Sequence, residues 1–264
     1  MPGFDDHQSP ALSDAQVQQF ITDGFIRIDH CFPRELADEG RKHLWHDTGC
    51  DPHDPTTWTQ PVIRLGDYGQ EPFRKAVNMP RLHAAFDQLE GPGGWLPRSS
   101  LGTFPVRFPS CDDTGDAGWH AEASFEGADG SWRLNVSSDG RALLMLFLFS
   151  DVSDTDAPTR IRVGSHLDVP PLLQPSGDAG LSFLELAEKL DVTANRPVAL
   201  ATGEAGTAYL CHPFLVHAGQ PHRGTAPRFM AQPPLYPAKP FQLHRDDGDY
   251  SPVEIAIRVG LGVY

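Results

Sequence analysis

The segment Gly118-Trp119-His120-Ala121-Glu122 places a histidine and a glutamate two positions apart in a stretch with the character of a β-strand. Side chains two positions apart in a strand point to the same face, so the imidazole of His120 and the carboxylate of Glu122 are expected to converge. Two histidines and one carboxylate with open positions left over form the facial triad of non-haem Fe(II) oxygenases. The pair alone is equally compatible with a solvent-facing strand, so the third ligand matters.

A second segment, Cys211-His212-Pro213-Phe214-Leu215-Val216-His217, supplies the third candidate ligand. His217 is the predicted ligand, although a hydrogen-bonded core histidine is also compatible with this apolar run. His212 competes for the same role, but it precedes a proline and would face the opposite side of an unbroken strand. Arg228 follows His217 by eleven residues, where a guanidinium could bind the far carboxylate of a 2-oxo acid bidentately. A surface ion pair is the alternative for Arg228.

These elements, in this order, resemble the phytanoyl-CoA dioxygenase-like (PhyH) branch of the Fe(II)/2-oxoglutarate oxygenases. The resemblance also includes Ala157-Pro158-Thr159-Arg160-Ile161-Arg162-Val163-Gly164-Ser165-His166 and the opening Leu12 to Asp29, and it extends from about residue 12 to about residue 260. One position departs from the pattern. The family usually has Asp where this chain has Glu122, and the extra methylene lengthens the ligand arm while it keeps the carboxylate.

The resemblance implies a mainly β fold with flanking helices, namely a double-stranded β-helix (jelly-roll, cupin-like) core with an N-terminal helical layer. It implies Fe(II), 2-oxoglutarate and O2 as cofactor and co-substrates, with ascorbate as a candidate reductant. The predicted reaction hydroxylates an unactivated C–H bond of a small molecule, such as a secondary metabolite, an amino acid or an acyl derivative, and releases succinate and CO2. Relatives that halogenate lack the carboxylate ligand, so Glu122 argues against halogenation.

The site residues follow from the same resemblance. The predicted metal ligands and catalytic residues are His120, Glu122 and His217. The predicted co-substrate residues are Arg228 for the C5 carboxylate of 2-oxoglutarate, Thr159 as a donor to the same carboxylate, and Arg107 as a further carboxylate-binding residue. Thr also simply favours strands, and an outward-facing Arg107 is the alternative for that position.

Two further function classes stay open. A cupin-like protein that binds Zn or Mn, such as an isomerase or a small-molecule binding module, would use the same two histidines and the glutamate without 2-oxoglutarate. Arg228 is the residue that discriminates against it. A relative of the family whose site has drifted out of use is the third possibility. Among the other histidines, His166 is expected to be a turn residue or to support the metal ligands indirectly, and His222 is expected to be solvated.

Composition sets limits on partners and location. The chain has 264 residues and a net charge of −14, which argues against nucleic acid or an anionic membrane surface as a partner. A small-molecule substrate and a monomer or homodimer are expected. Its four cysteines lack C-x-x-C spacing, which favours free thiols in a reducing cytoplasm. The first thirty residues lack the apolar core of a signal peptide, and the most apolar run, Leu143 to Phe149, is too short to span a bilayer.

The order of the predicted elements favours one oxygenase domain over residues 1–264. Helices dominate about residues 12–90, strands about 100–236, and a short helix covers about 251–260. Predicted helices begin at Ser13, Pro33, Pro80, Leu181 and Ser251, and predicted strands cover 25–29, 101–108, the stretch around His120, 132–137, 142–149, 159–163, 197–201, 207–211, 215–218 and 228–235. Residues 50–61 are expected to form a loop.

Overall fold

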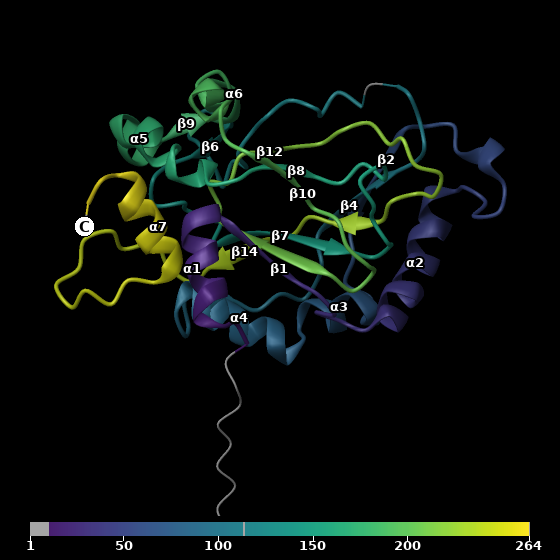
Figure 1. Ribbon diagram of the computed structural model, residues 1–264, viewed down its shortest axis with the longest axis horizontal. Coiled ribbons are helices and arrows are strands. Elements are labelled where there is room, and N and C mark those ends of the chain that lie inside the picture. Colours follow the sequence, from purple (N-terminus) through teal and green to yellow (C-terminus); the bar gives the residue numbers. More distant parts are fainter. Residues whose placement is uncertain (1–10, 113, 264) are drawn as a thin grey trace, which may run out of the picture.

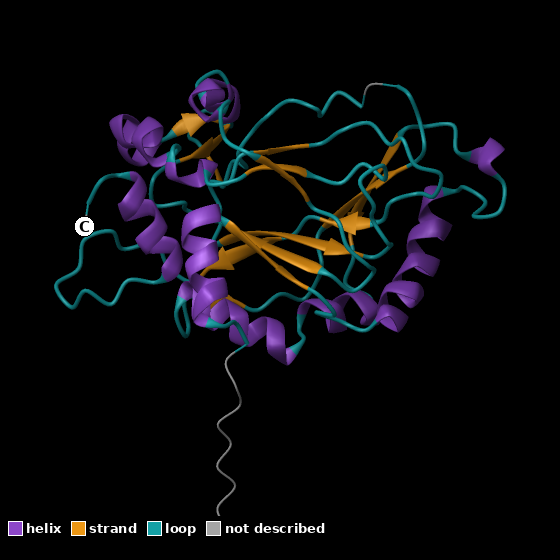
Figure 2. Cartoon of the chain, in the orientation of Figure 1, coloured by secondary structure: helices purple, strands orange, loops and turns teal. Residues whose placement is uncertain are grey.

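The computed structural model describes residues 11–112 and 114–263, and its strands lie in the centre with most helices around them (Figures 1 and 2). The helices are α1 (Asp14–Asp23), α2 (Arg34–Thr48), α3 (Glu71–Val77), α4 (Pro80–Glu90), α5 (Pro170–Leu173), α6 (Phe183–Ala187) and α7 (Pro252–Gly260). Short 3-10 helices are η1 (Pro55–Thr57), η2 (Ser165–Leu167), η3 (Gln174–Ala179) and η4 (Leu190–Thr193).

The strands pair antiparallel. They are β1 (Phe25–Ile28), β2 (Val62–Asp67), β3 (Trp95–Leu96), β4 (Thr103–Arg107), β5 (Phe125–Glu126), β6 (Trp132–Leu134), β7 (Leu143–Leu148), β8 (Arg160–Arg162), β9 (Leu181–Ser182), β10 (Val198–Leu200), β11 (Ala208–Cys211), β12 (His217–Ala218), β13 (Met230–Ala231) and β14 (Pro234–Pro237). The large sheet has the order β1-β11-β7-β14-β3, with β13 also paired to β7. A small sheet has the order β10-β8-β12, and β2-β4 and β5-β6-β9 form two more.

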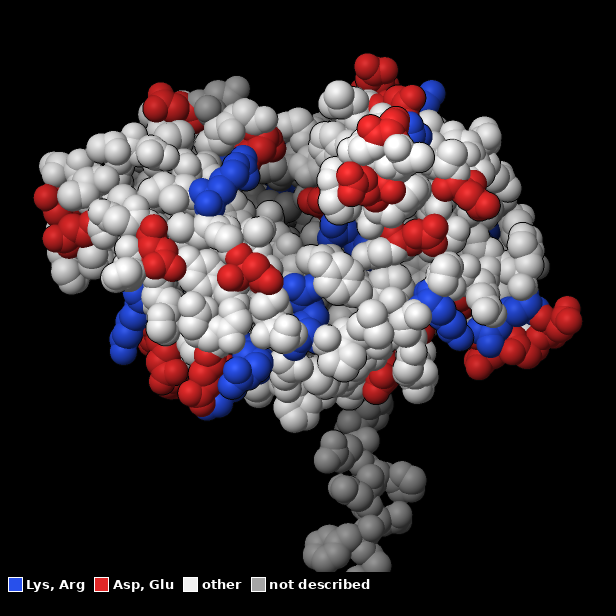
Figure 3. Space-filling model, turned by 180° about the vertical axis from the view of Figure 1, so that it is seen from behind, with Lys and Arg blue, Asp and Glu red and all other residues white. Residues whose placement is uncertain are grey.

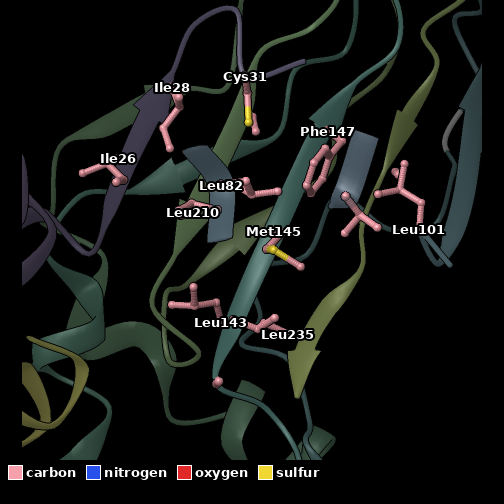
Figure 4. Close-up of a cluster of buried hydrophobic side chains, with 14 of the residues drawn as sticks. Ile26, Ile28, Cys31, Leu82, Leu101, Leu143, Met145, Phe147, Leu210 and Leu235 are labelled. Carbon is pink, nitrogen blue, oxygen red and sulfur yellow. The ribbon is translucent and has the colours of Figure 1, made fainter. Parts of the chain in front are cut away.

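Strand β7 separates two apolar clusters because its side chains alternate between the two faces of the large sheet. Met145 and Phe147 point into the cluster shared with the helices, where Leu82 of α4 and Leu210 of β11 also lie (Figure 4). Leu146, one position along, belongs to a second cluster that includes residues of β8 and β11. The large sheet therefore lies between helices α3 and α4 on one side and the small sheet on the other (Figure 1).

Local sequence signals explain where the helices begin and end. Ser13 accepts a hydrogen bond from the Gln16 amide in a capping box, as predicted, and α1 ends at Gly24, whose φ of 85° is the left-handed conformation that glycine adopts readily. Ser251 forms a second capping box with Glu254, with Pro252 at the first helical position of α7. These predictions from the sequence are confirmed.

The sequence prediction was wrong or incomplete at several elements. The strand expected around His120 is a single antiparallel bridge to His217, because the following residues leave the ladder. Helix α3 and strand β2 were not predicted. The helix expected over residues 181–190 is α6 followed by the 3-10 helix η4.

None of the helices in the described part of the chain combines the length and the apolar character of a membrane span. All four cysteines are free: Cys31 and Cys211 are buried, Cys50 is half-buried and Cys111 is exposed. Acidic and basic side chains are interspersed over the face shown in Figure 3.

Replacing Leu146 with Ala is expected to lower the free energy of unfolding by about 2–5 kcal/mol, because the side chain is 1% exposed between the two sheets and would leave a cavity. Leu184→Ala is the matched control, since Leu184 is 71% exposed and its truncation should change the free energy by no more than about 0.5 kcal/mol. Urea denaturation followed by circular dichroism measures both. Equal stability of the two variants would contradict the assigned packing of β7.

Candidate metal centre

His120 and His217 are brought together by their own backbones. The His120 amide donates to the His217 carbonyl at 3.0 Å, and the His217 amide donates to the His120 carbonyl at 2.9 Å. Residues that face each other in an antiparallel pair project their side chains to the same side, so the two imidazoles become neighbours. Their ring centroids are 4.4 Å apart.

Each imidazole has one nitrogen engaged and one available. The Nδ1 of His120 lies 2.9 Å from the Gly118 carbonyl, and the Nδ1 of His217 lies 3.0 Å from the Leu215 carbonyl. A carbonyl only accepts, so each Nδ1 must carry the proton, which leaves Nε2 with its lone pair. Burial, with His217 adding to it, lowers the pKa of His120 below its ordinary value, which favours the neutral ligand form.

Glu122 completes the cluster through one of its two oxygens. Its Oε1 lies 3.5 Å from His217 Nε2 and 3.8 Å from His120 Nε2, and one ligand atom from each of the three residues lies within 4.8 Å of the others. Burial raises the pKa of the Glu122 carboxyl, but the contact with His217 and the charge of Arg141 outweigh burial and bring the pKa to about 2. Glu122 is therefore anionic at neutral pH. Two imidazoles and one carboxylate suit a divalent transition metal.

The three residues line a cavity of about 160 Å³. Its wall draws on β2 and β4, on Thr159 just before β8, on the loops that carry Asp116, His120 and Glu122, and on the segment from His217 to Gln232. The lining residues are Arg64, Pro105, Arg107, Asp116, His120, Glu122, Thr159, His217, Gly219, Arg228 and Gln232. All six residues that the sequence singled out for metal or co-substrate binding are among them.

Arg228 is the most unusual group in this cavity. Its side chain is 1% exposed, and Nη1 donates to the Ala157 carbonyl, but Nε and Nη2 are buried without a hydrogen-bond partner in the described structure. Burial, with the nearby charge of Arg107 adding to it, lowers the pKa of Arg228 well below its ordinary value. A guanidinium nonetheless stays protonated in proteins, so this charge favours binding of an anion. Thr159 lies in the same wall, and within the described part of the chain its hydroxyl donates only to the weak acceptor Met230 Sδ, at 3.9 Å.

Arg107 lines the cavity but has a carboxylate of its own. Its Nη2 contacts Asp116, and Nη1 donates to Thr114 at 3.1 Å. Arg64 reaches the same Asp116 oxygen at 3.0 Å. The alternative of an outward-facing Arg107 is wrong, since the side chain is 4% exposed. Its predicted role in carboxylate binding stays a prediction.

The remaining histidines lie elsewhere. His212 is fully buried beside His166, with ring centroids 4.8 Å apart, and its Nδ1 accepts from the Phe214 amide rather than facing the cavity. His166 lies in η2 and its Nε2 contacts the Ile21 carbonyl at 3.0 Å. The expectation that His222 is solvated is wrong: it is 3% exposed, because its ring folds back so that Nδ1 accepts from Gly224.

Sequence reasoning missed several residues around the centre. Arg141 lies 3.8 Å from Glu122 Oε2, and Phe183 of α6 lies with its ring centroid 5.5 Å from that of His120. Neither has a motif of its own, and both reach the site only through tertiary contacts. Trp119, next to His120 in the sequence, lies under the guanidinium groups of Arg160 and Arg162 and does not line the cavity.

Comparison with solved structures shows which fold this is. HygX from Streptomyces hygroscopicus, solved with nickel, 2-oxoglutarate and hygromycin B bound, is 18% identical, with 88% of this chain and 90% of that chain covered and a TM-score of 0.56. SnoK, a non-haem α-ketoglutarate-dependent carbocyclase from nogalamycin biosynthesis, is 15% identical over 87% and 86% of the chains, with a TM-score of 0.61. The epimerase SnoN, in complex with Fe3+, α-ketoglutarate and nogalamycin RO, is 16% identical over 85% and 82%, with a TM-score of 0.58. The chain therefore has the fold of these enzymes.

No family model matches the chain, and no curated protein matches it. The likeness to the solved structures is thus one of fold.

Replacing His217 with Ala should weaken Fe(II) binding by more than about a hundredfold, because loss of a direct ligand exceeds the 10–100-fold effect typical of supporting residues. His212→Ala is the control. It should lower the melting temperature, since His212 is fully buried, while Fe(II) binding remains. Anaerobic metal titration and thermal melts of both variants test this assignment. Loss of metal binding in H212A but not in H217A would reverse it.

Proposed function

We propose that this protein is an Fe(II)/2-oxoglutarate-dependent dioxygenase that hydroxylates an unactivated C–H bond of a small molecule, with release of succinate and CO2. The observation that carries the proposal is Arg228. A buried guanidinium, two of whose nitrogens have no hydrogen-bond partner among the described residues, lines the same cavity as the two histidines and Glu122. The fold it shares with 2-oxoglutarate-dependent enzymes supports the same conclusion.

The residues that line the cavity fit both Fe(II) and 2-oxoglutarate. The donor set of two available imidazole nitrogens and one carboxylate oxygen suits Fe(II) and leaves positions open. Arg228, with Thr159 beside it as a hydroxyl donor, suits the C5 carboxylate of 2-oxoglutarate, because a carboxylate matches the planar fork of a guanidinium. A cupin-like metal protein or isomerase that does not use a 2-oxo acid would leave the charge of Arg228 unexplained.

The local charge of the cavity supports an anionic co-substrate. Three guanidinium groups (Arg64, Arg107 and Arg228) face two carboxylates (Asp116 and Glu122), so the cavity is basic although the chain carries a net charge of −14. A divalent cation would add to this local excess. Interactions within a few ångströms outweigh the screened charges of the distant surface, so the acidic surface does not prevent binding of a dianion.

In this proposal the protein's own residues bind and orient the metal and the co-substrate. Bound iron would supply the chemistry by which O2 oxidises both the 2-oxo acid, to succinate and CO2, and a C–H bond of the substrate. Nδ1 of each ligand histidine donates to a backbone carbonyl and so fixes the ring orientation. Arg228 orients the co-substrate from its far end. Phe183, 37% exposed beside His120, provides an apolar surface next to the centre on which a substrate can rest.

The finer assignments belong to the same proposal. The large and small sheets would form a double-stranded β-helix, and the chain would belong to the phytanoyl-CoA dioxygenase-like branch that its motifs resemble. The solved structures include a carbocyclase and an epimerase, so hydroxylation rests on the general chemistry of the class, and Glu122 argues only against halogenation. A small-molecule substrate and a monomer or homodimer complete the proposal.

Anaerobic addition of Fe(II) and 2-oxoglutarate to the purified protein is expected to produce the weak visible absorption band of an Fe(II)–2-oxo acid chelate. The physical reason is that the site offers a metal with open positions and an anchor for the far carboxylate. Addition of 2-oxoglutarate without Fe(II) is the control. Tight binding of Zn with no band for Fe(II) and 2-oxoglutarate would favour the cupin-like alternative.

Arg228→Leu should weaken 2-oxoglutarate binding by about 2–5 kcal/mol, because the variant removes one partner of a buried charge pair. This corresponds to about thirtyfold or more in affinity. Fe(II) binding should stay nearly intact, since Arg228 is not a ligand. Arg64→Ala is the matched control, because Arg64 lines the same cavity with a side chain that is 62% exposed. Unchanged 2-oxoglutarate affinity in R228L would rule out the assignment.

A further inference from the structure

Glu122 lacks the backbone support that its two partners have. His217 lies in β12 and His120 is paired to it by two hydrogen bonds, but the pairing ends at His120. Glu122 lies beyond the ladder, on an irregular segment before β5. The strand geometry that would have fixed its direction is therefore absent, and something else must set which oxygen faces the imidazoles.

Arg141 lies beside Glu122, where its guanidinium can determine which carboxylate oxygen faces the imidazoles. Its side chain is 12% exposed, and Nη2 lies 3.8 Å from Glu122 Oε2. The same nitrogen donates to the carbonyl of Ala123 at 3.3 Å, so Arg141 contacts both the carboxylate and the backbone that follows it. Its Nε is buried without a hydrogen-bond partner in the described structure. Glu122 is the carboxylate within ion-pair distance of this guanidinium among the described residues.

The turn that carries Arg141 is packed against the segment that carries Glu122. The Arg141 amide donates to the Ser138 carbonyl at 3.1 Å, and the Ser138 hydroxyl donates to the Arg141 carbonyl at 2.7 Å. Gly140 has a φ of 88°, and a Cβ at this position would lie 2.3 Å from the Ser124 carbonyl oxygen. Only glycine allows this close approach, so the guanidinium is held beside Glu122 by a tightly defined turn.

We propose that Arg141 is a positioning residue that holds Oε2 of Glu122 away from the imidazoles, so that the centre presents a single carboxylate oxygen. The inference rests on the proposed function and deepens it. Oε1 already faces both imidazoles, at 3.5 and 3.8 Å, while Oε2 faces Arg141. A second carboxylate oxygen on the metal would compete for a position that a chelating co-substrate needs.

The contact between Arg141 and Glu122 also matters because the candidate ligand is a glutamate and not the shorter aspartate. Glutamate has one more rotatable bond than aspartate, so its carboxylate can turn more freely about the metal. A guanidinium is planar and presents its donors in a rigid fork, whereas a lysine ammonium is a compact point charge on a flexible stem. Arg141 thus restricts a freedom that Glu122 would otherwise have.

The test compares Arg141→Met, Arg141→Lys and the control Arg133→Met. Met removes the charge and the donors at similar length, while Lys keeps the charge without the fork. Arg133 lies in the neighbouring strand β6 and pairs with Asp129 instead. Two affinities are measured anaerobically for each protein: that for Fe(II), and that for 2-oxoglutarate from the absorption band of the Fe(II)-loaded protein.

R141M is expected to bind Fe(II) about as well as the wild type but to bind 2-oxoglutarate about tenfold or more weakly, with a shifted band. R141K should lie between R141M and the wild type, and R133M should match the wild type. A merely structural role would weaken both affinities together and lower the melting temperature. If R141K equals the wild type while R141M is weak, charge alone suffices and the positioning role is overturned.

The same data separate this inference from the proposed function. If the wild type shows no band with Fe(II) and 2-oxoglutarate, the proposed function fails. If the wild type shows the band and R141M and R141K bind 2-oxoglutarate as R133M does, only the role of Arg141 fails. Should R141M not fold, R141K decides, because the proposal requires it to bind 2-oxoglutarate more weakly than the wild type.

Discussion

The candidate metal centre depends on two backbone hydrogen bonds between His120 and His217, which join segments that are far apart in the chain. This pairing puts both imidazoles on one side and at contact distance, and it extends the small sheet by one residue pair. Two carbonyls then fix the ring tautomers. Strand β8, which pairs with His217 of β12, follows Thr159 and brings it into the same wall, so one set of backbone bonds positions the candidate metal ligands and a candidate co-substrate residue together.

The charges that line this cavity favour an anionic ligand. The chain as a whole is acidic, but the cavity is locally basic, and its most buried charge, Arg228, has no carboxylate within ion-pair distance among the residues that the structure describes. A buried charge is costly unless it is paired, which makes an anionic ligand the natural partner. Arg107, by contrast, is neutralised by Asp116. Arg107 is therefore paired and Arg228 is not. An unpaired guanidinium is expected where a 2-oxo acid binds, but not in a metal protein that uses the same three ligands without a 2-oxo acid.

Much of the site could be predicted from the sequence because it depends on short-range rules. The two-residue spacing of His120 and Glu122, and the position of His217 before Arg228, are properties of the chain itself. The helix boundaries at Ser13 and Gly24 follow from capping chemistry, which acts over a few residues. The alternation of β7 follows from the two-residue period of a strand. None of these features needs distant contacts to be recognised.

The sequence by itself determined the residue types of the candidate ligands and the capping boxes that begin α1 and α7. Only the tertiary structure decided how Glu122 is held. The predicted strand continues past His120, but in the described structure its backbone pairing is the single bridge to His217. Arg141 and Phe183 reach the centre from a turn and a helix whose positions depend on packing across the whole domain. Long-range contacts of this kind leave no periodic signal in the sequence, which is why they appeared only in the folded chain.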